Sequence, residues 1–278
     1  MKRLAILIII LALAGCSSKA KPGATGTSSP SATATPSGTA SAPRNPSPQP
    51  DGSSRAVSPS ASASTRSTSK PTSVGPTVVP APGTYHYSQS GSASAGPFTF
   101  NADPTGTLAV GAPIVDGDAK REQQERVYSS SWSQQQILLF RSTGVFLKGI
   151  TSRFGSGAFV QEDTCTPSHA LKAIALPFVV GNSWSDQGTC NGRNVTIKGK
   201  VLRTESRTVG GTRVTTDVVN IMTHQTGNGY DVTVNLTMWI APSYGLSVHA
   251  TQTGSGSAQG YPFTENLTED LQRLTPDP

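Results

Sequence analysis

Large apolar side chains are missing from residues 17 to 80, which contain no Leu, Ile, Met, Phe, Tyr, Trp or Cys. Most of this stretch is Ser, Thr, Ala, Pro and Gly. Such a composition cannot bury enough apolar surface to offset the entropy that folding removes. We therefore expect residues 16–80 to be a disordered tether, which as a flexible coil spans roughly 40–50 Å root-mean-square.

Signatures of catalysis and metal binding are also missing. The sequence has no Gly-x-Ser-x-Gly and no Cys-x-x-Cys, and its histidines lack the spacing of His-Glu-x-x-His. Those histidines are His86, His169, His224 and His249. We therefore predict no catalytic residues, no metal site and no cofactor, and we expect the chain not to be an enzyme.

Positive charge is scarce where a nucleic-acid-binding surface would need it. The formal net charge of the chain is +6, but residues 81–278 contain 14 basic and 15 acidic residues. The excess lies in the first 80 residues, whereas nucleic-acid binding needs a basic patch on a folded face. We expect no nucleic-acid partner.

The N-terminus has the features of an export signal. Lys2 and Arg3 precede ten residues, Leu4 to Leu13, that are all Leu, Ile or Ala. This run is too short to span a bilayer but suits a signal peptide. The sequence Leu13-Ala14-Gly15-Cys16 that ends it resembles the lipobox of bacterial lipoproteins.

The lipobox resemblance implies that residues 1–15 are a lipoprotein signal peptide and that Cys16 carries the lipid, a diacylglyceryl group with an added acyl chain such as palmitate. The protein is then extracytoplasmic, anchored to the outer face of the cytoplasmic membrane in the cell envelope. The alternative is an ordinary signal peptide in which Cys16 is incidental.

Residues 81–278 have the pattern of an all-β domain. Val232, Val234, Leu236, Met238 and Ile240 share one face of a strand, because side chains alternate along it. Short breaks such as Gly210-Gly211 and Gly227-Asn228-Gly229 are hairpin signals. Regular short connections favour a curved antiparallel meander or half-barrel, and we expect a monomer.

Two segments are less regular. Thr166 and Pro167 resemble a helix start, so we predict one short helix over residues 167–175. Residues 263–274 fit either a helix or a strand, and we favour a strand that returns beside Gly245–Thr253.

Cys165 and Cys190 are the only cysteines left once Cys16 is lipidated. In an oxidising compartment such a pair predicts a disulfide.

Three motifs carry a second resemblance. They are Leu176-Pro177 with Gly181-Asn182-Ser183-Trp184, then Gly210-Gly211, then Trp239-Ile240-Ala241-Pro242 with Gly245-Leu246. Their order is similar to that of envelope β-proteins of unassigned activity, whose architecture resembles the half-barrels of LolA/LolB and LprG/LppX lipoproteins. The resemblance implies a curved sheet around one or more helices, and some members hold lipids in the cleft.

Ile137-Leu138-Leu139-Phe140 is apolar on both faces of its predicted strand and therefore needs cover on both. The predicted helix is one source of cover, and an acyl chain bound in a cleft is another. The residues we expect to line that cleft are Trp132, Leu138, Phe140, Trp184 and Trp239.

The favoured hypothesis is a lipid-anchored, non-enzymatic binding or structural module that holds an apolar, lipid-like ligand. Its partners would be the membrane, through Cys16, and lipid or cell-wall polymer. The alternatives are a hydrolase acting on the cell wall and a scaffold that docks other envelope proteins.

Overall fold

The computed structural model describes residues 78–155 and 160–278. The predicted signal peptide, the lipidation site Cys16 and the predicted tether up to residue 77 lie outside the described residues. The described residues form fifteen strands in one sheet. In chain order the strands are β1 (Gly83–Ala95), β2 (Phe98–Asn101), β3 (Thr105–Val110), β4 (Ile114–Asp116), β5 (Ala119–Ser129), β6 (Trp132–Arg141), β7 (Gly144–Phe154), β8 (Gln161–Cys165), β9 (Leu171–Ala175), β10 (Ser183–Cys190), β11 (Arg193–Val209), β12 (Thr212–Gly227), β13 (Tyr230–Ala241), β14 (Leu246–Ala258) and β15 (Tyr261–Leu271).

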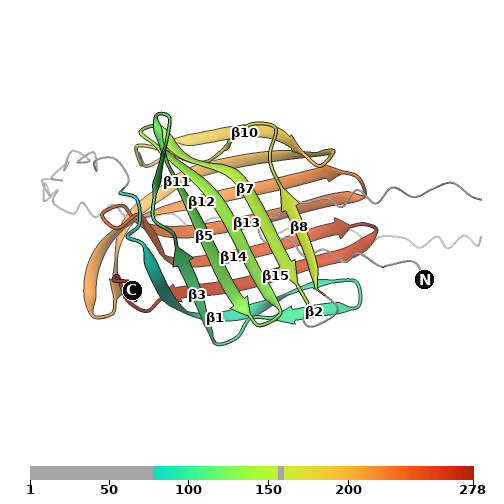
Figure 1. Cartoon of the computed structure of the whole chain (residues 1–278), viewed down its shortest axis with the longest axis horizontal. Coiled ribbons are helices and arrows are strands. Elements are labelled where there is room, and N and C mark those ends of the chain that lie inside the picture. Colours follow the sequence, from blue (N-terminus) through green and yellow to red (C-terminus); the bar gives the residue numbers. More distant parts are fainter. Residues whose placement is uncertain (1–77, 156–159) are drawn as a thin grey trace, which may run out of the picture. The chain divides into compact units, whose positions relative to one another are not determined.

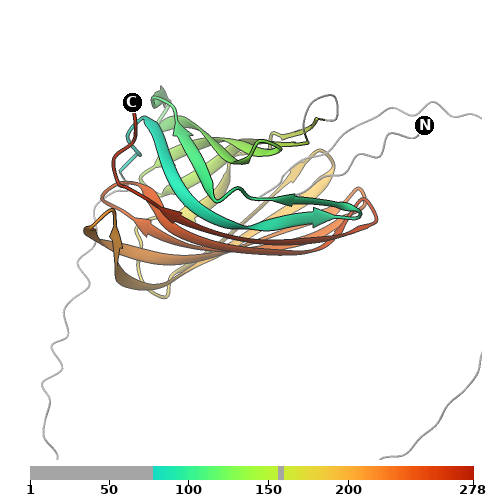
Figure 2. The same ribbon diagram turned by 90° about the horizontal axis from the view of Figure 1, so that it is seen from below.

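The sheet is antiparallel and folds back on itself. Its main path runs β10-β11-β12-β13-β14-β15-β1-β3-β5-β6-β7-β8, while β2, β4 and β9 pair with β1, β5 and β7. β5, β6 and β7 lie over β11 to β14, and β1 and β15 connect the two layers (Figures 1 and 2). The predicted all-β, antiparallel half-barrel is confirmed.

The alternating pattern positions the core between the layers. Along β13, Tyr230, Val232 and Val234 are buried whereas Asp231 and Asn235 are exposed. Equivalent buried residues come from both layers, so the two faces pack against each other across the interior. They include Leu147 and Ile150 of β7, Ile197 of β11, Val219 of β12 and Phe263 of β15.

Glycine-containing turns connect β11, β12 and β13, as predicted. β11 turns into β12 at Gly210-Gly211, whose φ angles are +53° and +82°. β12 turns into β13 at Asn228-Gly229, where φ is also positive. Positive φ is costly for most residues and free for Gly, so these positions specify the hairpins.

The predicted helix over residues 167–175 is wrong. Residues 166–170 are irregular and Leu171–Ala175 is β9, which pairs with β7 through Leu147↔Leu171 and Val145↔Ile174. A nine-residue helix is marginal on its own, whereas the open edge of β7 offers a hydrogen-bonding partner. The described residues contain no helix, and so none that could cross a membrane.

The C-terminal segment is a strand, which confirms the favoured alternative. β15 pairs with β14 from Ala258↔Tyr261 to His249↔Asp270 and with β1 on its other side. Phe263, Leu267 and Leu271 are buried on one face of β15. The period-two pattern therefore outweighs the helical spacing of the leucines.

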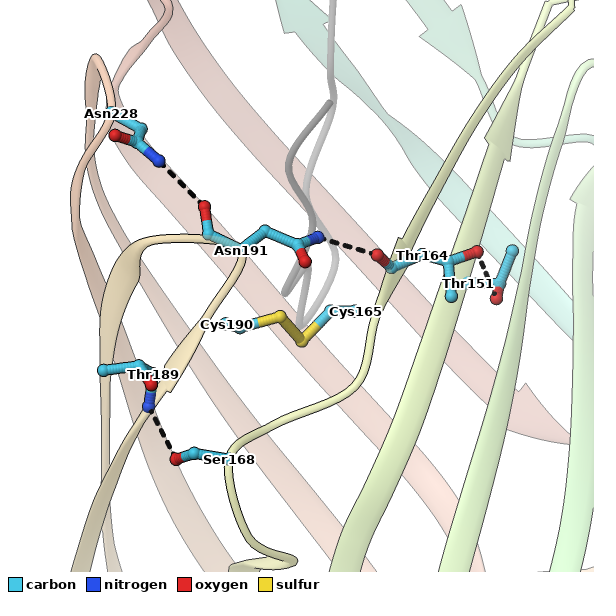
Figure 3. The surroundings of a disulfide bond; sticks show 8 residues. All are labelled: Thr151, Thr164, Cys165, Ser168, Thr189, Cys190, Asn191 and Asn228. Carbon is cyan, nitrogen blue, oxygen red and sulfur yellow. Dashed lines mark hydrogen bonds between the residues drawn. A yellow bond between two sulfur atoms is a disulfide. The ribbon is translucent and has the colours of Figure 1, made fainter. Parts of the chain in front are cut away.

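The predicted disulfide is present, and it joins the two edges of the sheet. Cys165 ends β8 and Cys190 ends β10, the last and first strands of the main path (Figure 3). Asn191 donates a hydrogen bond to the carbonyl oxygen of Thr164 at 2.8 Å across the same seam. The half-barrel is therefore held nearly closed here by a covalent link where no strand ladder exists.

Side chains extend this seam between β9 and β10. The indole of Trp184 donates to the carbonyl oxygen of Ala173 at 3.2 Å, and the carboxylate of Asp186 accepts from the amide of Lys172 at 2.7 Å. These contacts place β9 beside β10 and close the apolar interior on that side.

Candidate functional site

A cavity of about 170 Å³, partly open to solvent, lies between the two layers of the sheet. Its walls come from both layers, which follows from the way the sheet folds back. The side chains that line it are mainly those that the alternation directs inward: Leu108, Gln124, Arg126, Tyr128, Gln134, Gln136, Leu138, Phe140, Val145, Ala173, Ile174, Phe178, Ile221, Leu236, Met238, Ile240, Leu246, Ser247, Ala250, Gln252 and Glu269.

One part of the wall is apolar. Leu138 and Phe140 of β6 contribute to it together with Ile174 of β9. Met238 and Ile240 of β13 are further members of this part. Aliphatic and aromatic groups of this kind favour an alkyl or aromatic group over water.

The polar part of the wall comes mainly from β5, β6, β14 and β15. Arg126 of β5 forms an ion pair with Glu269 of β15 at 2.5 Å. The guanidinium of Arg126 also lies 4.6 Å from the ring centre of Tyr87. The two charges therefore neutralise each other inside the protein, and the tyrosine ring adds a cation–π contact.

Four glutamines line the same cavity: Gln124, Gln134, Gln136 and Gln252. Gln136 donates an amide N–H to Oε1 of Gln134 at 2.6 Å. Gln124 donates an amide N–H to Oε1 of Glu122 at 2.6 Å. The cavity is thus amphipathic, with an apolar wall and an amide-rich wall.

Two buried carboxyl groups lie in the same interior without lining the cavity. Burial raises the pKa of Glu122 to about 7, against the opposing hydrogen bond from Gln124. Burial also raises the pKa of Glu265 well above its ordinary value; Gln252 offsets part of this, while the charge of Glu269 adds to it. A carboxyl group resists ionisation in such a medium, so burial favours the neutral form of Glu265.

Among the predicted cleft residues, Leu138 and Phe140 line the cavity and the three tryptophans do not. Trp132 is a core residue whose ring stacks 4.4 Å from that of Tyr128. Trp184 lies at the β9–β10 seam. The cavity is therefore lined by the two predicted residues of β6, and the three tryptophans do not border it.

Trp239 follows Met238 in β13 and is directed elsewhere. Its indole donates to Glu205, and its ring meets that of His249 edge-on at 4.5 Å. Arg207 lies 4.7 Å from the centre of the same ring. Trp239 therefore belongs to a second apolar cluster that contains Val218 and Leu246.

Sequence reasoning missed the polar wall. Gln136 and Gln134 precede Leu138 by two and four residues, so they occupy the same strand face as Leu138 and Phe140. This shared face was the sequence signal that could have identified the two glutamines. Arg126 and Glu269 are 143 residues apart, and no local pattern connects them.

Residues 78–155 and 160–278 contain no cluster of three or more His, Cys, Asp or Glu residues that could hold a metal ion. Among the described residues that line the cavity, Glu269 is the only carboxylate, and it is paired with Arg126.

Comparisons with known proteins give no family. No family model and no curated protein matches the chain. Two solved structures are similar in part: a protein from Parabacteroides distasonis described as a lipoprotein, and the hypothetical lipoprotein YmcC from Escherichia coli. The first is 12% identical with a TM-score of 0.39 and covers 71% of this chain and 99% of its own. The second is 10% identical with a TM-score of 0.29 and covers 70% and 85%.

Proposed function

We propose that this chain is a lipid-anchored envelope protein that binds the apolar part of a small, lipid-like molecule without catalysing a reaction. Cys16 is the lipidation site, and the folded domain stays on the outer face of the cytoplasmic membrane. Its partners are the membrane, through the anchor, and a lipid or cell-wall component as ligand. The observation that carries the proposal is the cavity with its apolar wall.

The size of the cavity limits what can bind. Its volume of about 170 Å³ is close to that of an engineered apolar cavity of roughly 150 Å³ that takes up benzene. It is smaller than the roughly 300–1,000 Å³ of typical pockets for small molecules. The cavity therefore suits a molecule with one short alkyl or aromatic group and is too small for a multi-chain lipid.

The wall chemistry supports binding over catalysis. Hydrolysis needs convergent groups that can act as nucleophile, acid or base. The carboxylate of Glu269 is held by Arg126, and the other polar groups around it are mainly glutamine amides, which neither gain nor lose protons near pH 7.

The test has two arms. Full-length protein isolated from its native host is denatured, and the released small molecules are identified by mass spectrometry. We expect one amphiphile with a single short apolar part. In the second arm, full-length protein with Cys16→Ser is titrated with 1-hexanol and followed by the NMR methyl signals of Met238, Ile240 and Ala250. Shifts at these methyls support the proposal; no released ligand and no shifts would overturn it.

A further inference from the structure

We propose that the polar wall of the cavity selects an uncharged, hydroxyl-rich head group, of the sugar or polyol kind, over a phosphate. This inference rests on the proposed function and specifies the other half of the ligand. The short apolar group lies against Leu138, Ile174 and Met238, and the head lies against the glutamines of β5 and β6.

The charges of the cavity are already balanced. Arg126 and Glu269 are the only charged side chains among the described residues that line it. They contact each other at 2.5 Å, and Glu269 is only 6% exposed. A phosphate placed here would meet no free cation and would lie close to the carboxylate of Glu269. Burying an anion without a partner is costly, so the pair disfavours an anionic head.

The glutamines offer what a hydroxyl group needs. A primary amide has two N–H donors and an acceptor oxygen, and a hydroxyl both donates and accepts. Gln136 uses one N–H on Gln134, and Gln124 uses one on Glu122. Each of these two amides therefore keeps one N–H and its carbonyl oxygen for a ligand.

The two halves of this site lie in register on one strand. Gln134, Gln136, Leu138 and Phe140 follow one another at every second position of β6, and all four line the cavity. Successive side chains on one strand face are about 7 Å apart. A molecule lying along β6 would thus contact the amide of Gln136 with its head group and the side chain of Leu138 with its alkyl group, about 7 Å further along the strand.

The experiment compares two amphiphiles with the same six-carbon chain. Hexyl β-D-glucoside and hexyl phosphate are titrated separately, below their micelle-forming concentrations, into full-length protein carrying Cys16→Ser, with 1-hexanol as the reference. We expect the glucoside to bind at least about tenfold more tightly than the phosphate, because the glucoside hydroxyls both donate to and accept from the amides without burying an unpaired charge. Equal affinities, or tighter binding of the phosphate, would overturn the inference.

A pair of neighbouring variants locates the head group. Gln136→Met keeps the length of the side chain and removes its amide, whereas Gln135→Met makes the same change at a residue that does not line the cavity. We expect Gln136→Met to lower the preference for the glucoside over hexanol about tenfold. Gln135→Met should leave this preference unchanged. Equal effects of the two variants would argue against the site, and Gln124→Met repeats the test if Gln136→Met does not fold.

The outcomes separate the two proposals. Binding of hexanol without a preference for the glucoside rejects the sugar-like head and leaves the apolar cavity in place. Failure of hexanol, glucoside and phosphate alike rejects the proposed function, and this inference with it.

Discussion

Cys165 of β8 and Cys190 of β10 connect the two edge strands of a single sheet, with their Cα atoms 5.8 Å apart. The two cysteines are only 25 residues apart in sequence, yet they link opposite ends of the strand order. An open sheet leaves unpaired backbone at both edges. The disulfide and the side-chain contacts of β9 with β10 bring those edges together and shield the interior.

Removal of the disulfide should destabilise the protein. We expect the double variant Cys165→Ala/Cys190→Ala to lower the free energy of unfolding by about 3 kcal/mol, since the unfolded chain regains the entropy of a 25-residue loop. Urea unfolding measures this change. Reduced wild-type protein should behave like the variant, and a loss below about 1 kcal/mol in both would show that the noncovalent seam is sufficient.

Gly199 of β11 lies opposite Trp184 of β10 and leaves room for its indole. A Cβ atom at position 199 would overlap the indole ring. We expect Gly199→Ala to lower the free energy of unfolding by about 2 kcal/mol, because the indole must move and lose its hydrogen bond to the carbonyl oxygen of Ala173.

The matched control for this change is Gly149→Ala. A Cβ there would have its nearest neighbour at an ordinary 3.6 Å. This variant should be as stable as wild type or slightly more stable, because alanine restricts the unfolded chain. Similar thermal melting of the two variants would show that the Trp184 contact is not what requires glycine at position 199.

Local patterns predicted much of the fold. Alternation in β13 predicted its buried face, and the glycine-containing turns predicted the hairpins on either side of β12. These features depend on near neighbours in sequence, and sequence reasoning is strongest there. The prediction for β9 was wrong because Thr166-Pro167 resembles a helix start, whereas the pairing of β9 with β7 depends on the tertiary fold.

The candidate site was harder to predict for a related reason. Leu138 and Phe140 could be predicted from the sequence, because a strand that is apolar on both faces needs cover on both. The partners that complete the cavity come from strands that meet only when the sheet folds back. The three tryptophans were expected to border the cleft, but large aromatics serve equally as core and seam residues.

Glu122 should make stability depend on pH. It is 1% exposed, and burial raises its pKa from 4.5 to about 7. Between these values the folded state binds more protons than the unfolded state, so the free energy of unfolding falls as pH rises through this window and stays lowered above it. Glu122→Gln removes the titration and can still accept the hydrogen bond from Gln124.

We therefore expect Glu122→Gln to exceed wild type in stability above pH 7 by on the order of 1 kcal/mol and to match it near pH 4. Urea unfolding across this pH range measures the difference. Glu125→Gln, an exposed residue of the same strand, is the control and should follow the wild-type curve. Parallel curves for Glu122→Gln and wild type would contradict the prediction.

The proposed lipid anchor at Cys16 predicts a change in mass and in location. Mature protein should begin at Cys16 and carry two or three acyl chains, which together hold a protein stably on a membrane. We expect Cys16→Ser to remove the added mass and to move the protein from the membrane fraction to the soluble fraction. Intact-mass measurement and fractionation test both points. An unmodified Cys16 thiol in membrane-bound protein would contradict the prediction.

A cavity that binds an apolar group should lose that binding when it is filled from within. Ala250 of β14 lines the cavity, and its neighbour Thr251 does not. We expect Ala250→Phe to weaken 1-hexanol binding more than about tenfold, because the ring occupies the space of the alkyl chain. Its free energy of unfolding should stay within about 1 kcal/mol of wild type, since new apolar contacts offset the strain of the larger side chain. Thr251→Phe adds a similar ring to the same strand outside the cavity and should bind hexanol normally. If Ala250→Phe also binds normally, the alkyl chain lies elsewhere, and the cavity is a packing defect of a half-barrel whose function depends on another surface.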